Sequence, residues 1–90
     1  MELDFVKNIQ FTKLIKVDGR LKEFNFRKPH SRHEGSFTVD VMDDSGNRII
    51  FRMELSDNNW KIASQQLLPN WVVESEPAFN AMIDEEFKLN

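Results

Sequence analysis

The chain of 90 residues contains no cysteine and no tyrosine, and it holds only three glycines, three prolines and two histidines. Without cysteine the chain can form neither a disulfide framework nor a thiolate nucleophile. It also lacks the glycine-rich segment with which phosphate-binding loops surround their ligand. Both histidines lie in one short stretch of the sequence, which gives them no partners for acid–base chemistry elsewhere. We therefore predict a protein that is not an enzyme and that uses no cofactor.

Long apolar runs are absent as well. The longest apolar stretch, residues 67–73, is short and contains a proline, so the sequence predicts no membrane span. The first residues have no basic segment and no apolar core, which argues against a signal peptide. From these two features we expect a cytoplasmic protein.

What the sequence does contain is enough apolar material for one core. Hydrophobic residues make up 40% of the chain and include eight phenylalanines and two tryptophans. This content is too apolar for a disordered chain, and the length suits one domain near the small end of those that fold alone. We predict a single domain over residues 1–90.

Turn residues divide the first half of the chain into strands with alternating apolar and polar residues. Asp18-Gly19 is typical of a two-residue hairpin turn, because glycine adopts positive φ freely and aspartate tolerates it. The turn predicts the cross-strand pairs Val17–Arg20, Phe11–Phe26 and Lys13–Phe24.

A second hairpin follows from the same alternation. Pairing Val41 with Ile49 leaves Asp44-Ser45-Gly46 as a three-residue loop, with Gly46 in the left-handed conformation. The same pairing sets Val39 opposite Phe51 and Phe37 opposite Met53, so inward apolar residues meet on one face. A shift of one residue would move one of the two sets to the opposite face.

Residues 56–68 admit two interpretations. In the first, Asp57-Asn58 forms another tight turn, which pairs Leu55 with Trp60 and Met53 with Ile62. In the second, a helix begins at Ser56 and carries Trp60, Ala63 and Leu67 along one side. We favour the strand, because its inward residues come into register without adjustment.

The periodicity then changes to that of a helix over about residues 76–88. Ser75 suits the N-cap and Pro77 the first turn, and Phe79, Met82, Ile83 and Phe87 follow helical spacing. The predicted fold is therefore α+β. It is a five-stranded antiparallel β-meander, flat or curled, with strands near 9–17, 20–28, 35–42, 48–55 and 59–66, followed by one C-terminal amphipathic helix.

The sheet presents more apolar surface than this one helix can cover. Five strands of about six residues offer a face of roughly 480 Å², whereas a helix of about 13 residues covers roughly 200 Å². The uncovered remainder predicts protein–protein interaction or self-association, with a homodimer as the simplest case. We expect the candidate interaction surface to include Trp71, Val72 and Val73.

Two other functions are compatible with the sequence. The sheet could cup around an apolar pocket, closed by Trp71 and the helix, and bind a small apolar ligand. Alternatively, the basic N-terminal part could bind an anion or nucleic acid. Residues 1–33 hold eight Lys/Arg against four Asp/Glu, whereas residues 34–90 hold four against eleven. The candidate anion-binding loop consists of Arg27, Lys28, His30, Arg32 and His33.

Metal binding and nucleic-acid binding are the weaker interpretations of that loop. His30, His33 and Glu34 offer ligands for a divalent ion, but the Arg and Lys residues beside them repel a cation and no fourth ligand is evident. A charged, solvated loop is the usual role of such residues. We therefore predict no metal site and treat nucleic acid as an improbable partner.

Overall fold

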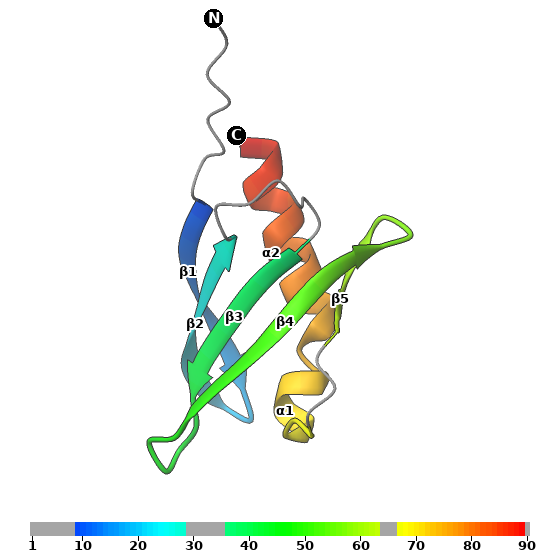
Figure 1. Ribbon diagram of the computed structural model, residues 1–90. Helices are drawn as coiled ribbons and strands as arrows, with labels where there is room; N and C mark the ends of the chain where they lie inside the picture. Colours follow the sequence, from blue (N-terminus) through cyan, green and yellow to red (C-terminus); the bar gives the residue numbers. More distant parts are fainter. Residues whose placement is uncertain (1–8, 29–35, 64–66, 90) are drawn as a thin grey trace, which may run out of the picture.

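The computed structural model describes residues 9–28, 36–63 and 67–89. One antiparallel sheet has the strand order β1-β2-β3-β4-β5 and curls around the helix α2, which lies on its concave side (Figure 1). The elements are β1 (Ile9–Val17), β2 (Arg20–Lys28), β3 (Ser36–Met42), β4 (Arg48–Ser56), β5 (Asn59–Ile62), α1 (Asn70–Val73) and α2 (Glu76–Leu89). The predicted α+β fold is confirmed, and the sheet is a curled half-barrel.

Cross-strand pairing follows the register that the turn residues predict. In the first hairpin Val17 pairs with Arg20. The remaining predicted pairs are also present, namely Phe11–Phe26, Lys13–Phe24, Val41–Ile49, Val39–Phe51, Phe37–Met53, Leu55–Trp60 and Met53–Ile62. Residues 56–62 therefore contain a turn and a strand rather than a helix. The strand β5 ends at Ile62, and the predicted extension over 64–66 lies outside the described residues.

The three tight turns hold their backbone in the left-handed region. Asp18 and Gly19 have φ of 51° and 79°, and Asp57 and Asn58 have φ of 52° and 67°. Positive φ at both central residues gives these two-residue turns the twist that matches their strands. Gly46 has φ of 85°, as the three-residue loop requires.

Asp43 organises the turn between β3 and β4. Its carboxylate accepts hydrogen bonds from the backbone amides of Ser45 at 2.9 Å and Asn47 at 2.8 Å. Its own amide donates to the carbonyl of Asn47 at 2.8 Å. Local hydrogen bonds thus hold the loop in its conformation.

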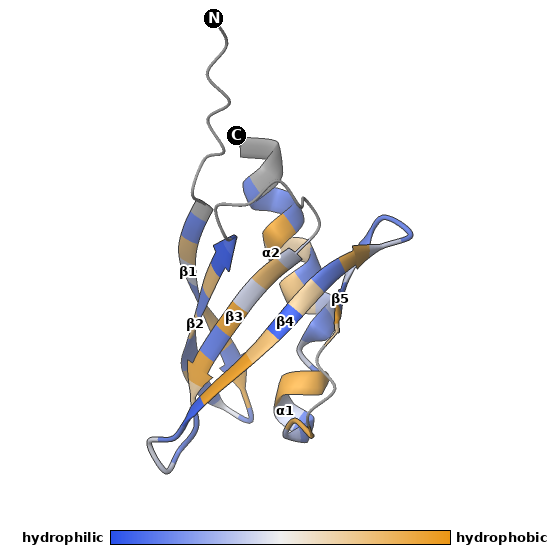
Figure 2. Ribbon diagram, viewed as in Figure 1, coloured by the Kyte–Doolittle hydropathy of each residue, from blue (hydrophilic) through white to orange (hydrophobic). Residues whose placement is uncertain are grey.

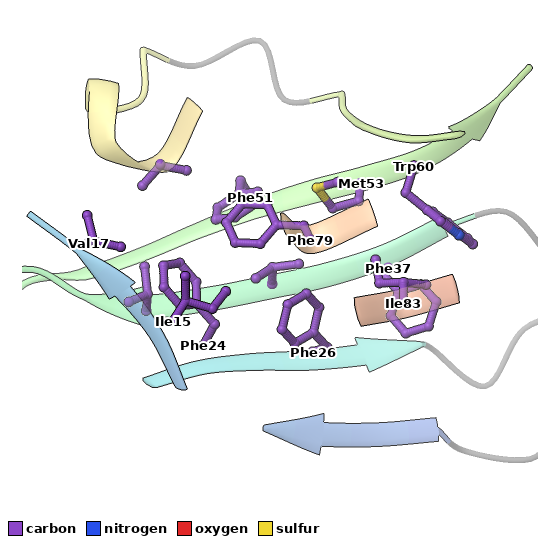
Figure 3. Close-up of a cluster of buried hydrophobic side chains, with 13 residues drawn as sticks. Ile15, Val17, Phe24, Phe26, Phe37, Phe51, Met53, Trp60, Phe79 and Ile83 are labelled. Carbon is purple, nitrogen blue, oxygen red and sulfur yellow. The ribbon is translucent and has the colours of Figure 1, made fainter. Parts of the chain in front are cut away.

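The core lies between the concave face and the two helices. Figure 3 shows Phe79 and Ile83 of α2 pointing into the aromatic and aliphatic side chains of the strands. Phe79 and Ile83 are fully buried, as is Val72 of α1. The strands contribute Ile15, Val17, Phe24, Phe26, Phe37, Val39, Val41, Phe51, Met53 and Trp60.

This core corrects the estimate of uncovered surface. That estimate took the sheet as flat, whereas the sheet curls around α2 and α1 covers the end that α2 does not reach. The main exception is Leu55, which belongs to the inward set but is 49% exposed. It lies at the far end of β4, where the hairpin with β5 extends beyond the helix (Figure 1).

Ser75 stands at the start of α2 as predicted, but its hydroxyl has another partner. Its carbonyl accepts the first helical hydrogen bond, from the Phe79 amide at 3.0 Å. Its hydroxyl donates to the carbonyl of Trp71 at 2.8 Å. Ser75 therefore joins the short helix α1 to α2, and α1 itself was not predicted from the sequence.

The strand register assigns each side chain of β4 to the core or to solvent, and this assignment can be tested. Phe51 is 2% exposed and opposes Val39 inside the curled sheet, so Phe51→Ala should lower the free energy of unfolding by about 3–5 kcal/mol. Its neighbour Arg52 faces outward and forms an exposed ion pair with Glu54, so Arg52→Ala should change that free energy by about 0.5 kcal/mol. Denaturant unfolding measures both, and equal costs would contradict the facing assignment.

Candidate interaction surface

The concave face, where the sequence suggested a ligand pocket, is filled by the protein's own side chains. The ring of Phe79 packs against those of Phe24, Phe26 and Phe51, with centroids 5.1, 5.9 and 5.5 Å apart. Phe37 and Trp60 add an edge-to-face contact at 5.1 Å. An apolar ligand would have to displace α2 to enter this space.

The three residues of the predicted surface, Trp71, Val72 and Val73, differ in their burial. Val72 is fully buried, and Trp71 packs edge-to-face on Phe24 at 6.2 Å. The ammonium group of Lys22 lies 4.8 Å from the centroid of the Trp71 indole, a cation–π contact. Val73 is half exposed and Trp71 is partly buried, so both retain apolar surface that a partner could contact. The segment covers one end of the curled sheet through Val72 and Trp71.

Lys22 also connects Trp71 to the turn between β3 and β4. Its Nζ lies 2.8 Å from Asp44 Oδ1, and Arg20 Nη1 lies 3.3 Å from the same oxygen. The hydrogen bond from Lys22, together with the charges of Lys22 and Arg20, lowers the pKa of Asp44. With its pKa lowered, Asp44 stays ionised to a lower pH than an unpaired aspartate does.

The candidate anion-binding loop is only partly within the described residues. Arg27 is exposed on β2 and Lys28 is buried, whereas His30, Arg32 and His33 lie outside the described residues. In the described part of the chain, no three His, Asp or Glu residues gather as metal ligands would.

Several cations elsewhere on the sheet are paired with carboxylates. Arg48 lies 3.2 Å from Asp40, Arg52 lies 3.2 Å from Glu54, and Lys13 lies 3.3 Å from Glu86. These pairs reduce the positive field that an anionic partner would require.

The convex face carries a band of exposed aliphatic side chains. Four residues from four strands are each 48–66% exposed, namely Leu14, Leu21, Met42 and Ile50. In the register, Leu14 and Leu21 are diagonal neighbours, as are Met42 and Ile50, and Leu21 and Met42 line one shallow depression. We call these four residues the aliphatic band. Figure 2 shows the hydrophobic segments of β3 and β4 that flank the turn at this end.

A polar ladder crosses the same face beside the aliphatic band. The Thr12 hydroxyl donates to Asn25 Oδ1 at 2.7 Å, and the Asn25 amide donates to Asp40 Oδ1 at 3.0 Å. Arg48 Nη2 completes the ladder by donating to Asp40 Oδ2 at 3.2 Å. One connected set of side-chain bonds therefore links β1 to β4 across the convex surface.

The outer edge of β5 is closed by two side chains of α2. The backbone amide of Trp60 donates to Asn80 Oδ1 at 2.6 Å, and that of Ile62 donates to Glu76 Oε2 at 2.8 Å. Four residues of helix rise about 6 Å and two residues of strand about 6.6 Å, so the two acceptors match the spacing of the two amides. The donors that would otherwise recruit a further strand are thereby satisfied.

In the described part of the chain, the outer edge of β1 pairs with no other strand. Within the described residues β1 pairs only with β2, and the two-residue turn makes Val17–Arg20 a hydrogen-bonded pair. Hydrogen-bonded pairs recur at every second residue along an antiparallel pair of strands. The end of β5 shows the same alternation, because the backbone amide of Ala63 donates to the carbonyl of Arg52 on β4 at 2.8 Å. The even-numbered residues of β1 therefore direct their N–H and C=O groups away from the sheet; they are Gln10, Thr12, Leu14 and Lys16.

Sequence reasoning did not single out these surface residues. The aliphatic band does leave a signal in the sequence, because each of its members is apolar at a strand position where the alternating pattern predicts a polar residue. The closure of the β5 edge by Glu76 and Asn80 leaves no signal in the sequence, because the groups that these side chains bind are backbone amides distant along the chain.

The closed edge can be tested at the level of single amides. Glu76→Ala and Asn80→Ala each leave one amide of β5 without an acceptor, and each should lower the free energy of unfolding by about 1–2 kcal/mol. Amide exchange measured by NMR should accelerate at Ile62 in the first variant and at Trp60 in the second. Glu85→Ala, on the exposed side of the same helix, is the control and should change neither amide. Unchanged exchange at Trp60 and Ile62 would refute the closure.

Comparisons with known proteins complete the description of the surface. No protein-family model matches the chain, and neither a curated protein nor a solved structure shows significant similarity to it. No helix in the described ranges combines the length and apolar character that crossing a bilayer requires. The function must therefore be inferred from the geometry of this chain.

Proposed function

We propose that the domain is a non-enzymatic self-association module, and that two copies join through the outer edge of β1. The observation that carries the proposal is the difference between the two edges of the sheet. α2 caps the amides of β5, whereas β1 offers a nine-residue edge that is unpaired among the described residues. An uncovered strand edge is a template for pairing with another chain.

Shape favours the edge over the convex face as the contact. Two convex faces curve away from each other and touch over a small area. Pairing along β1 instead continues the sheet from one copy into the next. The aliphatic band reaches this edge through Leu14, so apolar contact accompanies the backbone bonds.

The closed edge limits the size of the assembly. A chain with two open edges could add copies without end, as aggregating sheets do. Among the described strands, β1 alone offers an edge for pairing, and a two-fold arrangement uses the β1 edge of both copies. The expected product is a closed homodimer.

The other two functions have less support. Binding of an apolar ligand would require α2 to leave the concave face, where Phe79 and Ile83 are fully buried. Binding of nucleic acid draws less support from the described residues, where Lys13, Lys22 and Arg48 each lie beside a carboxylate. A cytoplasmic location accords with the absence of cysteine and forms part of the proposal.

Sedimentation equilibrium at micromolar concentration tests the proposal. The protein should show twice the 10.6 kDa mass of one chain and should dissociate on dilution. Lys16→Pro removes an outward amide without removing a bond to β2, so it should yield a folded monomer. Lys16→Ala keeps the amide and should remain a dimer.

Circular dichroism is the control for folding, and it should show that both Lys16 variants are folded. A mass of 10.6 kDa for the unmodified protein at every concentration would refute self-association. A dimer that persists in Lys16→Pro would show that the contact lies elsewhere on the surface.

A further inference from the structure

We infer that the two copies pair in antiparallel fashion with their two-fold axis at Leu14. This inference rests on the proposed self-association through β1 and specifies its register. The partner is a second copy of this chain, and the choice among registers follows from which backbone groups point outward and from which side chains would then face each other.

Backbone geometry restricts the registers first. Only the even-numbered residues of β1 direct hydrogen-bonding groups outward, so even residues must pair with even residues across the interface. Two-fold pairings that use at least seven of the nine residues of β1 can then be centred only on Thr12, Lys13 or Leu14.

The register centred on Lys13 is excluded by charge. It would set the Lys13 side chains of the two copies directly opposite each other, and like charges in that position are destabilising. Lys13 already lies 3.3 Å from Glu86, on the concave side of its own sheet. That ion pair weakens the repulsion, but both ammonium groups stay on the same face of the joined sheet.

The register centred on Thr12 fits the side chains poorly. It places two Thr12 side chains together, although this hydroxyl already donates to Asn25 at 2.7 Å. It also sets exposed Leu14 opposite Gln10 and leaves Lys16 beyond the paired residues of β1. No apolar surface on the convex face is matched with apolar surface.

The register centred on Leu14 brings apolar side chains together on both faces. Leu14 of each copy faces the other on the convex side, and Phe11 faces Val17 on the concave side. No two charged side chains are opposed, because Lys16 meets Thr12 and Lys13 meets Ile15. The aliphatic bands of the two copies also become continuous at the axis.

Single cysteines report the register, since the native chain contains none. At the axis the two Leu14 Cα atoms should lie about 5.5 Å apart, within the range of about 4.4–6.8 Å that a disulfide spans. The two Thr12 positions, and likewise the two Lys16 positions, are offset by four residues, or about 13 Å along the strand. Under mild oxidation Leu14→Cys should give a covalent dimer, and Thr12→Cys and Lys16→Cys should not.

The outcomes distinguish this register from the proposed function itself. If the unmodified protein is a dimer but Thr12→Cys cross-links faster than Leu14→Cys, or none of the three cross-links, the axis is not at Leu14 while self-association stands. If the unmodified protein is a monomer, both inferences fail. All three positions are exposed, so the substitutions leave the core intact.

Charge at the axis gives an independent test. A residue on a two-fold axis faces its own copy, so Leu14→Glu and Leu14→Lys should each raise the dimer dissociation constant by about tenfold. An equimolar mixture of the two variants should recover affinity by forming a heterodimer. Tighter association in either single variant, or a mixture that associates no better than its components, would overturn the two-fold contact at Leu14.

Discussion

The insertion of Phe79 into the concave face is the contact on which the rest of the structure depends. Its ring touches aromatic side chains of β2 and β4, so one helical residue joins strands from both hairpins. The sheet curls around this contact, and the curl brings β5 beside the first turns of α2. There Glu76 and Asn80 reach the backbone of β5. One packing contact thereby determines which edge of the sheet is closed and which remains open.

The elements governed by local chemistry could be predicted from the sequence. Asp18-Gly19 and Gly46 set two hairpins, and the alternation around Val39 and Phe51 left one register that buries apolar residues on both strands. Features that depend on distant contacts could not be predicted in the same way. The curl of the sheet requires α2 in place. The burial of Val72 follows from that curl, although the apolar run of Trp71, Val72 and Val73 suggested an exposed patch.

The two faces of the sheet reflect different physical demands. On the concave side close packing leaves little freedom, and the cluster of buried side chains is apolar. On the convex side polar side chains bond to one another across strands, as in the series Thr12, Asn25, Asp40 and Arg48. The aliphatic band interrupts that polar surface without any need from the core. Residues that folding does not require are the ones that point to a role in association.

The position of α2 in the chain has a consequence for folding during synthesis. All five strands precede the helix that covers them, so a growing chain presents the concave face to solvent until Phe79 has been made. The tight turns allow the hairpins to form early, but an isolated hairpin is at best marginally stable. The amides of Trp60 and Ile62 also lack their helical acceptors at that stage. A nascent chain that stops before Phe79 therefore exposes the apolar face that α2 covers in the folded domain.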